Sequence, residues 1–124
     1  MTTLQLVAEL AVAVLYVVGA VFSTVYTLGQ SDRFYGSWVE GAWHEPARWF
    51  LRNVILPHAK GFTVALILFE TTVAALILGQ GDLAGPALVA GTVFCIMAAV
   101  VSSPGGTVGN LALAAIQTAL ALAR

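Results

Sequence analysis

The chain contains four long runs of apolar residues, and these runs limit the folds that it can adopt. They cover residues 4–28, 62–79, 86–101 and 106–122. A helix needs about 20 mostly apolar residues to cross the hydrocarbon core of a bilayer, and each run is near that length. Because backbone polar groups inside lipid must be satisfied within the protein, the runs predict four membrane-spanning helices.

Composition leads to the same class. Of the 124 residues, 60% are hydrophobic and 9% are charged, and the mean hydropathy is +0.94. A soluble domain of this length needs more charge on its surface, so we expect one integral membrane domain over residues 1–124. The net charge of −1 gives no basic footprint for a nucleic acid partner.

Proline and glycine divide the runs, as GQGDLAGP between the second and third and SSPGG between the third and fourth. Such short connections predict antiparallel neighbours in an all-α bundle. The first run carries Glu9 and lacks a basic start. It is also too long for the apolar part of a signal peptide, so we interpret it as a retained span.

Basic residues predict the orientation of this bundle. Four spans place both termini on one side of the membrane. The connection over residues 30–60 carries Arg33, Arg48, Arg52 and Lys60, whereas the opposite side has only Arg124. The positive-inside rule therefore predicts that the connection is cytoplasmic and that both termini lie outside.

The connection also contains a predicted amphipathic helix over residues 46–56, with the sequence PARWFLRNVIL. Pro46 suits a first helical turn, and Pro57 ends the helix. At 100° per residue, five apolar side chains share one arc beside two arginines. The pattern predicts a short helix in the membrane interface, with tryptophans at the depth of the headgroups. The residues of the arc are Ala47, Phe50, Leu51, Val54 and Ile55.

A second interpretation of this connection is a ligand site. The side chains of Arg48, Arg52 and His58, beside Trp49, would then line the entry of a quinone or of an anionic ligand. The interfacial anchor is the favoured interpretation, because tryptophan and arginine are ordinary residues at a membrane edge.

Each predicted span has one face of small or polar residues, and membrane helices pack through such faces. The stripe on the first span is Glu9, Ala13, Tyr16, Ala20, Ser23 and Thr27. The others are Thr63, Glu70 and Ala74 on the second, Gly91, Cys95, Ala98 and Ser102 on the third, and Asn110, Ala114, Gln117 and Ala121 on the fourth. Together they predict a compact bundle with a polar interior.

Depth within the spans selects a candidate cluster from these stripes. Tyr16, Glu70 and Gln117 lie near the middle of their spans, and Asn110 shares the stripe of Gln117. We predict that Tyr16 or Gln117 is the hydrogen-bond partner of Glu70. Structurally, Glu70 would be a neutral hydrogen-bonding residue that fixes helix register. Functionally, it would carry a proton or orient a ligand such as a quinone headgroup. The structural interpretation is favoured.

The order of spans and the stretch FTVALILFETTVAALILG resemble the DoxX and DoxX-like membrane proteins. The matching residues are Gly19-Ala20-Val21-Phe22 in the first span, and Glu70, Val73, Leu76 and Gly79 in the second. The resemblance implies a four-helix bundle in a bacterial inner membrane. It also implies a link to redox or quinone-associated systems.

The sequence lacks the residues that several kinds of catalytic or metal site require. Cys95 is the only cysteine, so no CxxC pair exists, and His44 and His58 lie in the connection rather than in a span. We therefore expect no catalytic residues and no metal site. The favoured function is a non-catalytic accessory subunit that packs against a larger membrane complex, respiratory or redox, or against copies of itself. The alternative is a handler of a hydrophobic molecule, a quinone or a lipid, bound within the bundle at Glu70.

Overall fold

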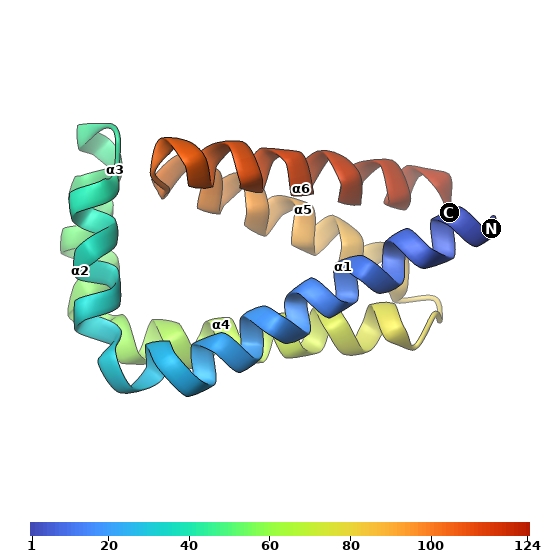
Figure 1. Ribbon diagram of the computed structural model, residues 1–124, viewed down its shortest axis with the longest axis horizontal. Coiled ribbons are helices and arrows are strands. Elements are labelled where there is room, and N and C mark those ends of the chain that lie inside the picture. The colour runs from blue at the N-terminus through green and yellow to red at the C-terminus, as the bar shows by residue number, and fades with distance from the viewer.

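The computed structural model describes all 124 residues, and its regular elements are all helical. Four long helices pack along one another, and shorter segments lie across one end of them (Figure 1). The long helices are α1 (Thr3–Phe22), α4 (Ala59–Leu78), α5 (Ala84–Val101) and α6 (Pro104–Ala123). Both chain termini lie at the end opposite the shorter segments, as four antiparallel crossings require (Figure 1).

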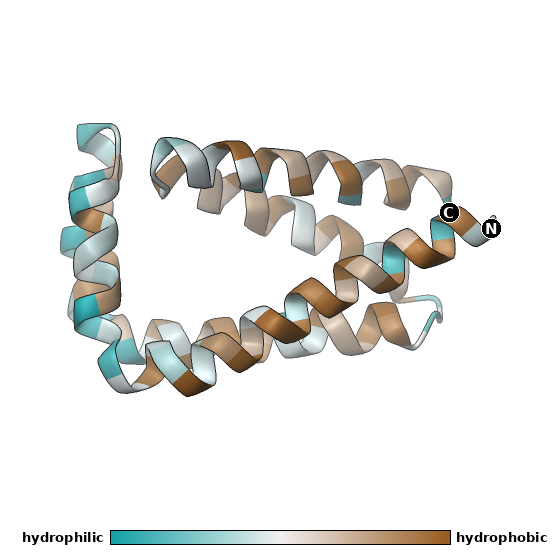
Figure 2. Cartoon of the chain, in the orientation of Figure 1, coloured by the Kyte–Doolittle hydropathy of each residue, from teal (hydrophilic) through white to brown (hydrophobic).

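The predicted spans correspond to these four helices with small shifts of their bounds. The helical path through α1 extends past Leu28, and α4, α5 and α6 each begin two or three residues earlier than expected. All four are long and apolar enough to cross a membrane, and Figure 2 shows their mainly hydrophobic colouring. The all-α class is confirmed, and the four helices fit a multi-pass membrane protein.

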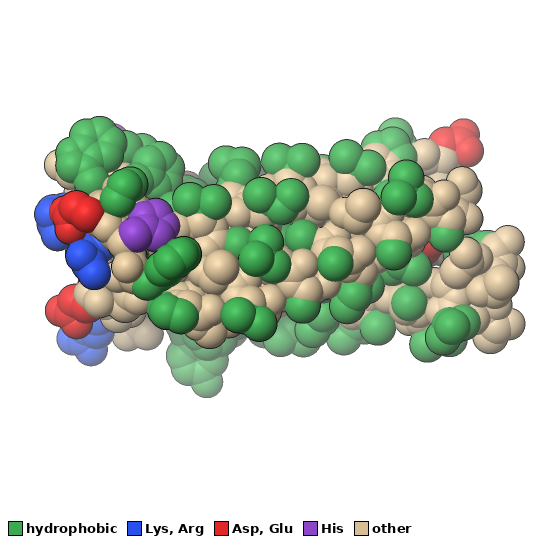
Figure 3. All heavy atoms as spheres, turned by 90° about the horizontal axis from the view of Figure 1, so that it is seen from above, with side chains coloured by type: hydrophobic (Ala, Val, Ile, Leu, Met, Phe, Trp, Pro, Cys, Tyr) green, Lys and Arg blue, Asp and Glu red, His purple; other side chains and the backbone are tan.

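The outer surface of the bundle is apolar along its length (Figure 3). Large side chains such as Val14, Leu68, Met97 and Val108 are 55%, 64%, 63% and 70% exposed. A soluble monomer rarely exposes apolar residues over so wide an area. The charged side chains visible in this view gather mainly at the end with the shorter segments (Figure 3). This surface suits contact with lipid.

α1 leads into the first short segment without a loop, and the backbone leaves the helical region only at Gln30 (φ −141°, ψ 40°). A π-helical turn (Ser23–Thr27) and a 3-10 turn (Leu28–Gln30) lead into α2 (Ser31–Gly41). The Thr24 hydroxyl donates to the carbonyl of Ala20 at 2.8 Å, and the Ser31 hydroxyl donates to that of Thr27 at 2.9 Å. Hydroxyls bonded to their own helix in this way bend it, as π turns also do, and the chain turns here.

The second short segment enters α4 in the same manner. It consists of α3 (Glu45–Phe50), a π turn (Leu51–Ile55) and a 3-10 turn (Leu56–His58). Pro57 lies within the 3-10 turn and has no backbone N–H to continue an α-helical ladder. We refer to α2 and residues Glu45–His58 together as the end layer.

The end layer was only partly predicted. The expected helix over residues 46–56 is helical from Glu45 to His58 and leads on into α4, so the prediction that Pro57 ends it was wrong. Helix α2 was not predicted. Part of the predicted apolar arc packs against the protein, and the rest is exposed. Ala47, Leu51 and Ile55 are buried, whereas Phe50 and Val54 are exposed.

The interior has two apolar clusters. One lies among the four long helices and contains Val12, Ala13, Tyr16, Val73, Ala74, Ile77, Ala87, Leu88 and Leu120. The other joins the end layer to the start of α4 and contains Tyr35, Ala42, Ala47, Leu51, Ile55 and Ala59. All six members of the predicted stripe on the first span are buried, so the interior face of α1 is confirmed.

Candidate functional site

A buried group of polar side chains joins three helices near the middle of the bundle. The Tyr16 hydroxyl, on α1, donates to Gln117 Oε1, on α6, at 2.7 Å. Gln117 Nε2 lies 3.4 Å from the Cys95 sulfur, on α5, and the Tyr16 hydroxyl lies 3.9 Å from the same sulfur. We call these three residues the Tyr16 cluster. These contacts fix the positions of α1, α5 and α6 relative to one another along the bundle axis.

Close approach of the helices makes this cluster possible. A Cβ atom built at Gly91, on α5, would collide with Gln117 Oε1 and with the Tyr16 hydroxyl. Only glycine leaves room for both polar groups at this point. Small residues at helix interfaces in membranes allow such close approach of the backbones.

Glu70 stands apart from the Tyr16 cluster. Glu70 is 8% exposed. Its carboxylate lies against Gly19 of α1, and a Cβ atom added to Gly19 would collide with it. The structure records no hydrogen bond to this carboxylate, although Tyr16 and Gln117 were its predicted partners. Tyr16 has one hydroxyl proton and donates it to Gln117. The helical periodicity correctly predicted that Tyr16, Glu70 and Gln117 lie in the interior. It did not predict which of them are hydrogen-bonded to each other.

The fourth candidate of the predicted cluster also lies elsewhere. Asn110 Nδ2 donates to the carbonyl of Gly106, one turn earlier on α6, at 2.9 Å. Seven residues separate Asn110 from Gln117, which is about 10 Å along a helix. The structure therefore brings Tyr16 and Gln117 together, and it leaves Glu70 and Asn110 outside their hydrogen bonds.

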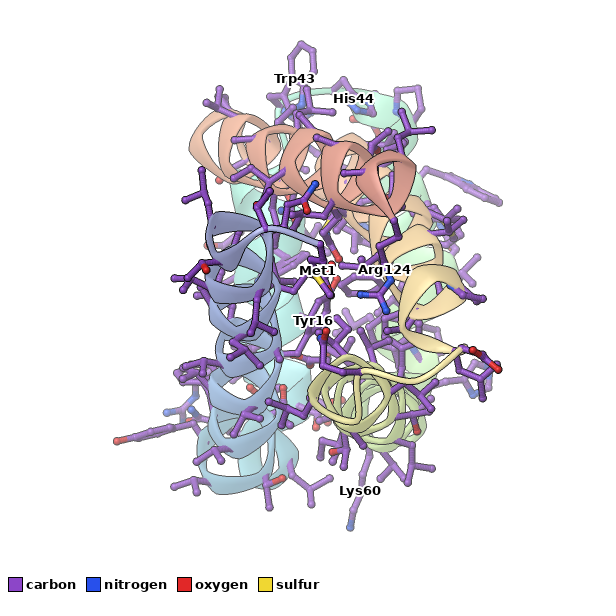
Figure 4. The ribbon with its side chains drawn as sticks, turned by 90° about the vertical axis from the view of Figure 1, so that its right-hand side faces the viewer. Met1, Tyr16, Trp43, His44, Lys60 and Arg124 are labelled. Carbon is purple, nitrogen blue, oxygen red and sulfur yellow. The ribbon has the colours of Figure 1, made fainter.

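A buried ion pair at the terminal end of the bundle was not predicted. Arg124 Nη1 lies 2.6 Å from Glu9 Oε1, and Gln80 Nε2 donates to the same oxygen at 3.0 Å. The Glu9 side chain is fully buried, and the Arg124 side chain is 21% exposed. Figure 4 shows Arg124 directed into the bundle, with Met1 close by. The pair joins the end of α6 to α1 and to the turn after α4.

Hydroxyl groups continue the polar interior toward the end layer. The Ser31 and Thr63 hydroxyls lie 3.2 Å apart, and Thr63 also donates to the carbonyl of Ala59 at 2.8 Å. The Tyr35 hydroxyl is buried beside them without a hydrogen-bond partner. Burial raises the pKa of the Tyr35 phenol above its usual value, since a phenolate would be poorly solvated there.

The four residues proposed to line a ligand entry, Arg48, Trp49, Arg52 and His58, do not surround a common pocket. Arg48 pairs with Glu45 at 3.1 Å and donates from Nε to the carbonyl of Ala42 at 3.1 Å. Trp49, Arg52 and His58 are exposed on the end layer.

A different histidine makes a tertiary contact. His44 Nε2 lies 2.7 Å from the carbonyl of Val100, in the last turn of α5, while His44 Nδ1 accepts from the backbone N–H of Ala47 at 3.1 Å. An exposed carbonyl near a helix end is a ready hydrogen-bond acceptor. His44 therefore connects the end layer to α5.

Comparison of this chain with protein-family models, with characterised proteins and with solved structures found no match.

Proposed function

We propose that this chain is a non-catalytic accessory subunit that packs against a larger membrane complex through the outer face of α6. The observation that carries the proposal is a row of small residues directed away from the bundle. Gly105 and Gly109 are exposed, and a Cβ atom at either position would meet nothing within 4 Å. Three exposed alanines, Ala112, Ala119 and Ala123, lie farther along the same face, which Ile116 interrupts between the first two.

The physical reason is the way in which helices associate in lipid. Lipid tails are as apolar as leucine, so helices gain from close backbone packing rather than from removal of water. Small residues spaced by about four positions allow that packing. α6 also has the most surface left for a partner, because only 17% of its most apolar 18-residue stretch is buried, against 28–33% for the other three spans.

The identity and setting of the complex follow from the DoxX-like resemblance. It supports a respiratory or redox complex in a bacterial inner membrane. We place the end layer on the cytoplasmic side, with the segment Glu45–His58 lying in the interface and both termini outside. The charge bias supports this orientation, because Arg124, the basic residue at the terminal end, has its charge paired with Glu9.

The test is purification from native membranes in a mild detergent, with identification of the proteins that co-purify. We expect the wild-type chain to elute in an assembly larger than itself. The double variant Gly105→Leu/Gly109→Leu should lose the assembly, because two large side chains separate the backbones. Gly61→Leu is the matched control, since Gly61 is also an exposed helical glycine with open space around it.

Three outcomes would contradict the proposal. In the first, the wild-type chain elutes alone, and in the second, the double variant keeps its partners. The third is a turnover measured with the purified chain by itself and lost on changing an interior residue. An assembly that contains only copies of this chain would identify the partner of α6 as a second copy.

Glu70 supports a second candidate function, the handling of a hydrophobic molecule with a polar headgroup, such as a quinone or a lipid. Its carboxylate lies in the interior and forms no hydrogen bond within the chain, so it is free to bond a ligand. A short-chain benzoquinone is the probe, and its quenching of tryptophan fluorescence is the measurement. Glu70→Leu should weaken quenching at least tenfold, and unchanged quenching would reject this candidate.

A further inference from the structure

Two hollows lie on the outer surface along α1 and α4, on a side of the molecule that the proposed contact of α6 does not use. The first is a groove of about 550 Å³ between α1 and α4. Eight of its ten lining residues are hydrophobic, among them Val17, Val25, Ile67 and Ala75. Such a groove suits an apolar chain.

The second hollow lies where α1 passes into α2, and its chemistry is the opposite. It has a volume of about 630 Å³, and one of its seven lining residues, Leu28, is hydrophobic. Arg33 and Lys60 supply two cationic side chains, and Asp32 supplies one carboxylate. Neither cation is in an ion pair, so the hollow has a net positive charge.

The two hollows follow the same pair of helices. Leu28 lines the polar hollow and Val25 lines the groove, and three residues separate them. On α4, Lys60 and Ile67 are seven residues apart, which places them on one helix face about two turns from each other. Figure 4 shows the Lys60 side chain extending away from α4 on the outside of the bundle. One elongated molecule can therefore occupy both hollows.

The positions of the two hollows along the bundle match the acyl-chain and headgroup levels of one lipid leaflet. On α1 the groove lies between Val25 and Val17, about 5 to 16 Å along the helix from Leu28. One leaflet of the hydrocarbon core is about 15 Å thick, so the groove covers the depth of acyl chains in that leaflet. The polar hollow lies at the end of the bundle where charged side chains gather, the level of headgroups (Figure 3).

We propose that this surface binds one phospholipid with an anionic headgroup. The headgroup phosphate accepts hydrogen bonds from Arg33 and Lys60, and an acyl chain lies in the groove between α1 and α4. Cations on short juxtamembrane segments favour anionic lipids in this way. A phospholipid supplies the anionic group and the apolar chain in one molecule, as the neighbouring hollows require.

The test uses the full chain reconstituted in vesicles of phosphatidylcholine, with a few per cent of spin-labelled phosphatidylglycerol or spin-labelled phosphatidylcholine as the probe. We expect the motionally restricted fraction to favour phosphatidylglycerol. The selectivity should fall about fivefold for each cation removed in Arg33→Gln and Lys60→Gln. Arg52→Gln is the control, because it removes one exposed cation of the same end layer outside the hollow.

A second variant tests the groove independently of charge. Ala75→Phe fills the groove and should reduce the restricted fraction for both probes, whereas Leu68→Phe, at an exposed position outside the groove, should not. Selectivity that is unchanged in the double variant Arg33→Gln/Lys60→Gln would overturn the proposal. Equal effects of Ala75→Phe and Leu68→Phe would also overturn it. Loss of the preference for phosphatidylglycerol in millimolar inorganic phosphate would overturn it as well, because the hollow would then recognise a free phosphate rather than a lipid.

Discussion

Two glutamates are buried among the four long helices, and their surroundings differ in kind. Glu9 is bonded to Arg124 and Gln80. Glu70 lies against Gly19 and has no hydrogen bond within the chain. Glu9 Oε1 has a cation and an amide as partners, whereas Oε2 is buried without a hydrogen bond. The bonds to Oε1 join three parts of the chain, so the role of Glu9 is to hold helices together. A carboxylate without such bonds adds nothing to the fold that an apolar residue would not, and this leaves it available to a ligand.

The largest effect in this comparison should come from the bonded glutamate. Arg124→Leu removes the cation from a fully buried carboxylate, and the free energy of unfolding should fall by about 3–5 kcal/mol. Unfolding by sodium dodecyl sulfate in mixed micelles, followed by circular dichroism, measures it. Replacing both partners, Glu9→Leu/Arg124→Leu, should recover much of the loss, since no charge then stays buried alone. A loss for Arg124→Leu no larger than that for Arg52→Leu would show that the ion pair contributes nothing.

A smaller loss should follow from crowding the Tyr16 cluster. Gly91→Ala places a Cβ atom against Gln117 and Tyr16, and overpacking of this kind costs about 1–3 kcal/mol. The same unfolding measurement applies. In the background of Tyr16→Phe/Gln117→Ala the substitution should cost much less, because both colliding oxygen atoms are gone. Gly109→Ala is the control, since its Cβ would meet open space; equal losses for the two alanine variants would contradict the packing described here.

The smallest effect on stability should come from the unbonded glutamate. Glu70→Leu removes no hydrogen bond and removes a costly intramembrane carboxyl, so stability should stay within about 0.5 kcal/mol of the wild type or rise. A loss above about 2 kcal/mol would mean that Glu70 is bonded like Glu9, and the contrast between them would disappear. If Glu70 transfers protons for a host complex, Glu70→Gln should abolish that activity while assembly survives.

Much of the interior follows from residue spacing alone. Along the first predicted span, a period of 100° per residue selects Glu9, Tyr16 and Thr27 as members of one face, and all three are buried. That spacing identifies a face and a depth, but it does not choose among partners at equal depth. Tyr16 therefore met Gln117 while Glu70 met Gly19. The choice depends on how the helices tilt, which single-helix periodicity does not contain.

Other misses have different physical causes. Arg124 was counted only for orientation, because a residue at the end of the sequence gives no sign that its side chain turns back to Glu9. Helix α2 was missed because Gly36 and charged residues conceal its pattern. Tyr35 and Val39, four residues apart, pack toward the second apolar cluster, and this spacing is the signal that would have indicated a helix.

The continuity of the backbone between the end layer and two of the spans has a mechanical consequence. A single helical path runs from Thr3 to Gly41, and another from Glu45 to Leu78. No flexible linker separates the layer from α1 or α4, so the layer and these spans act as two bent levers. A displacement of the end layer would therefore change the tilt of α1 and α4. The bends of the two levers lie at Gln30 and His58, where the backbone leaves the helical region (φ −141°, ψ 40° and φ −123°, ψ 30°), and such a lever would yield there first.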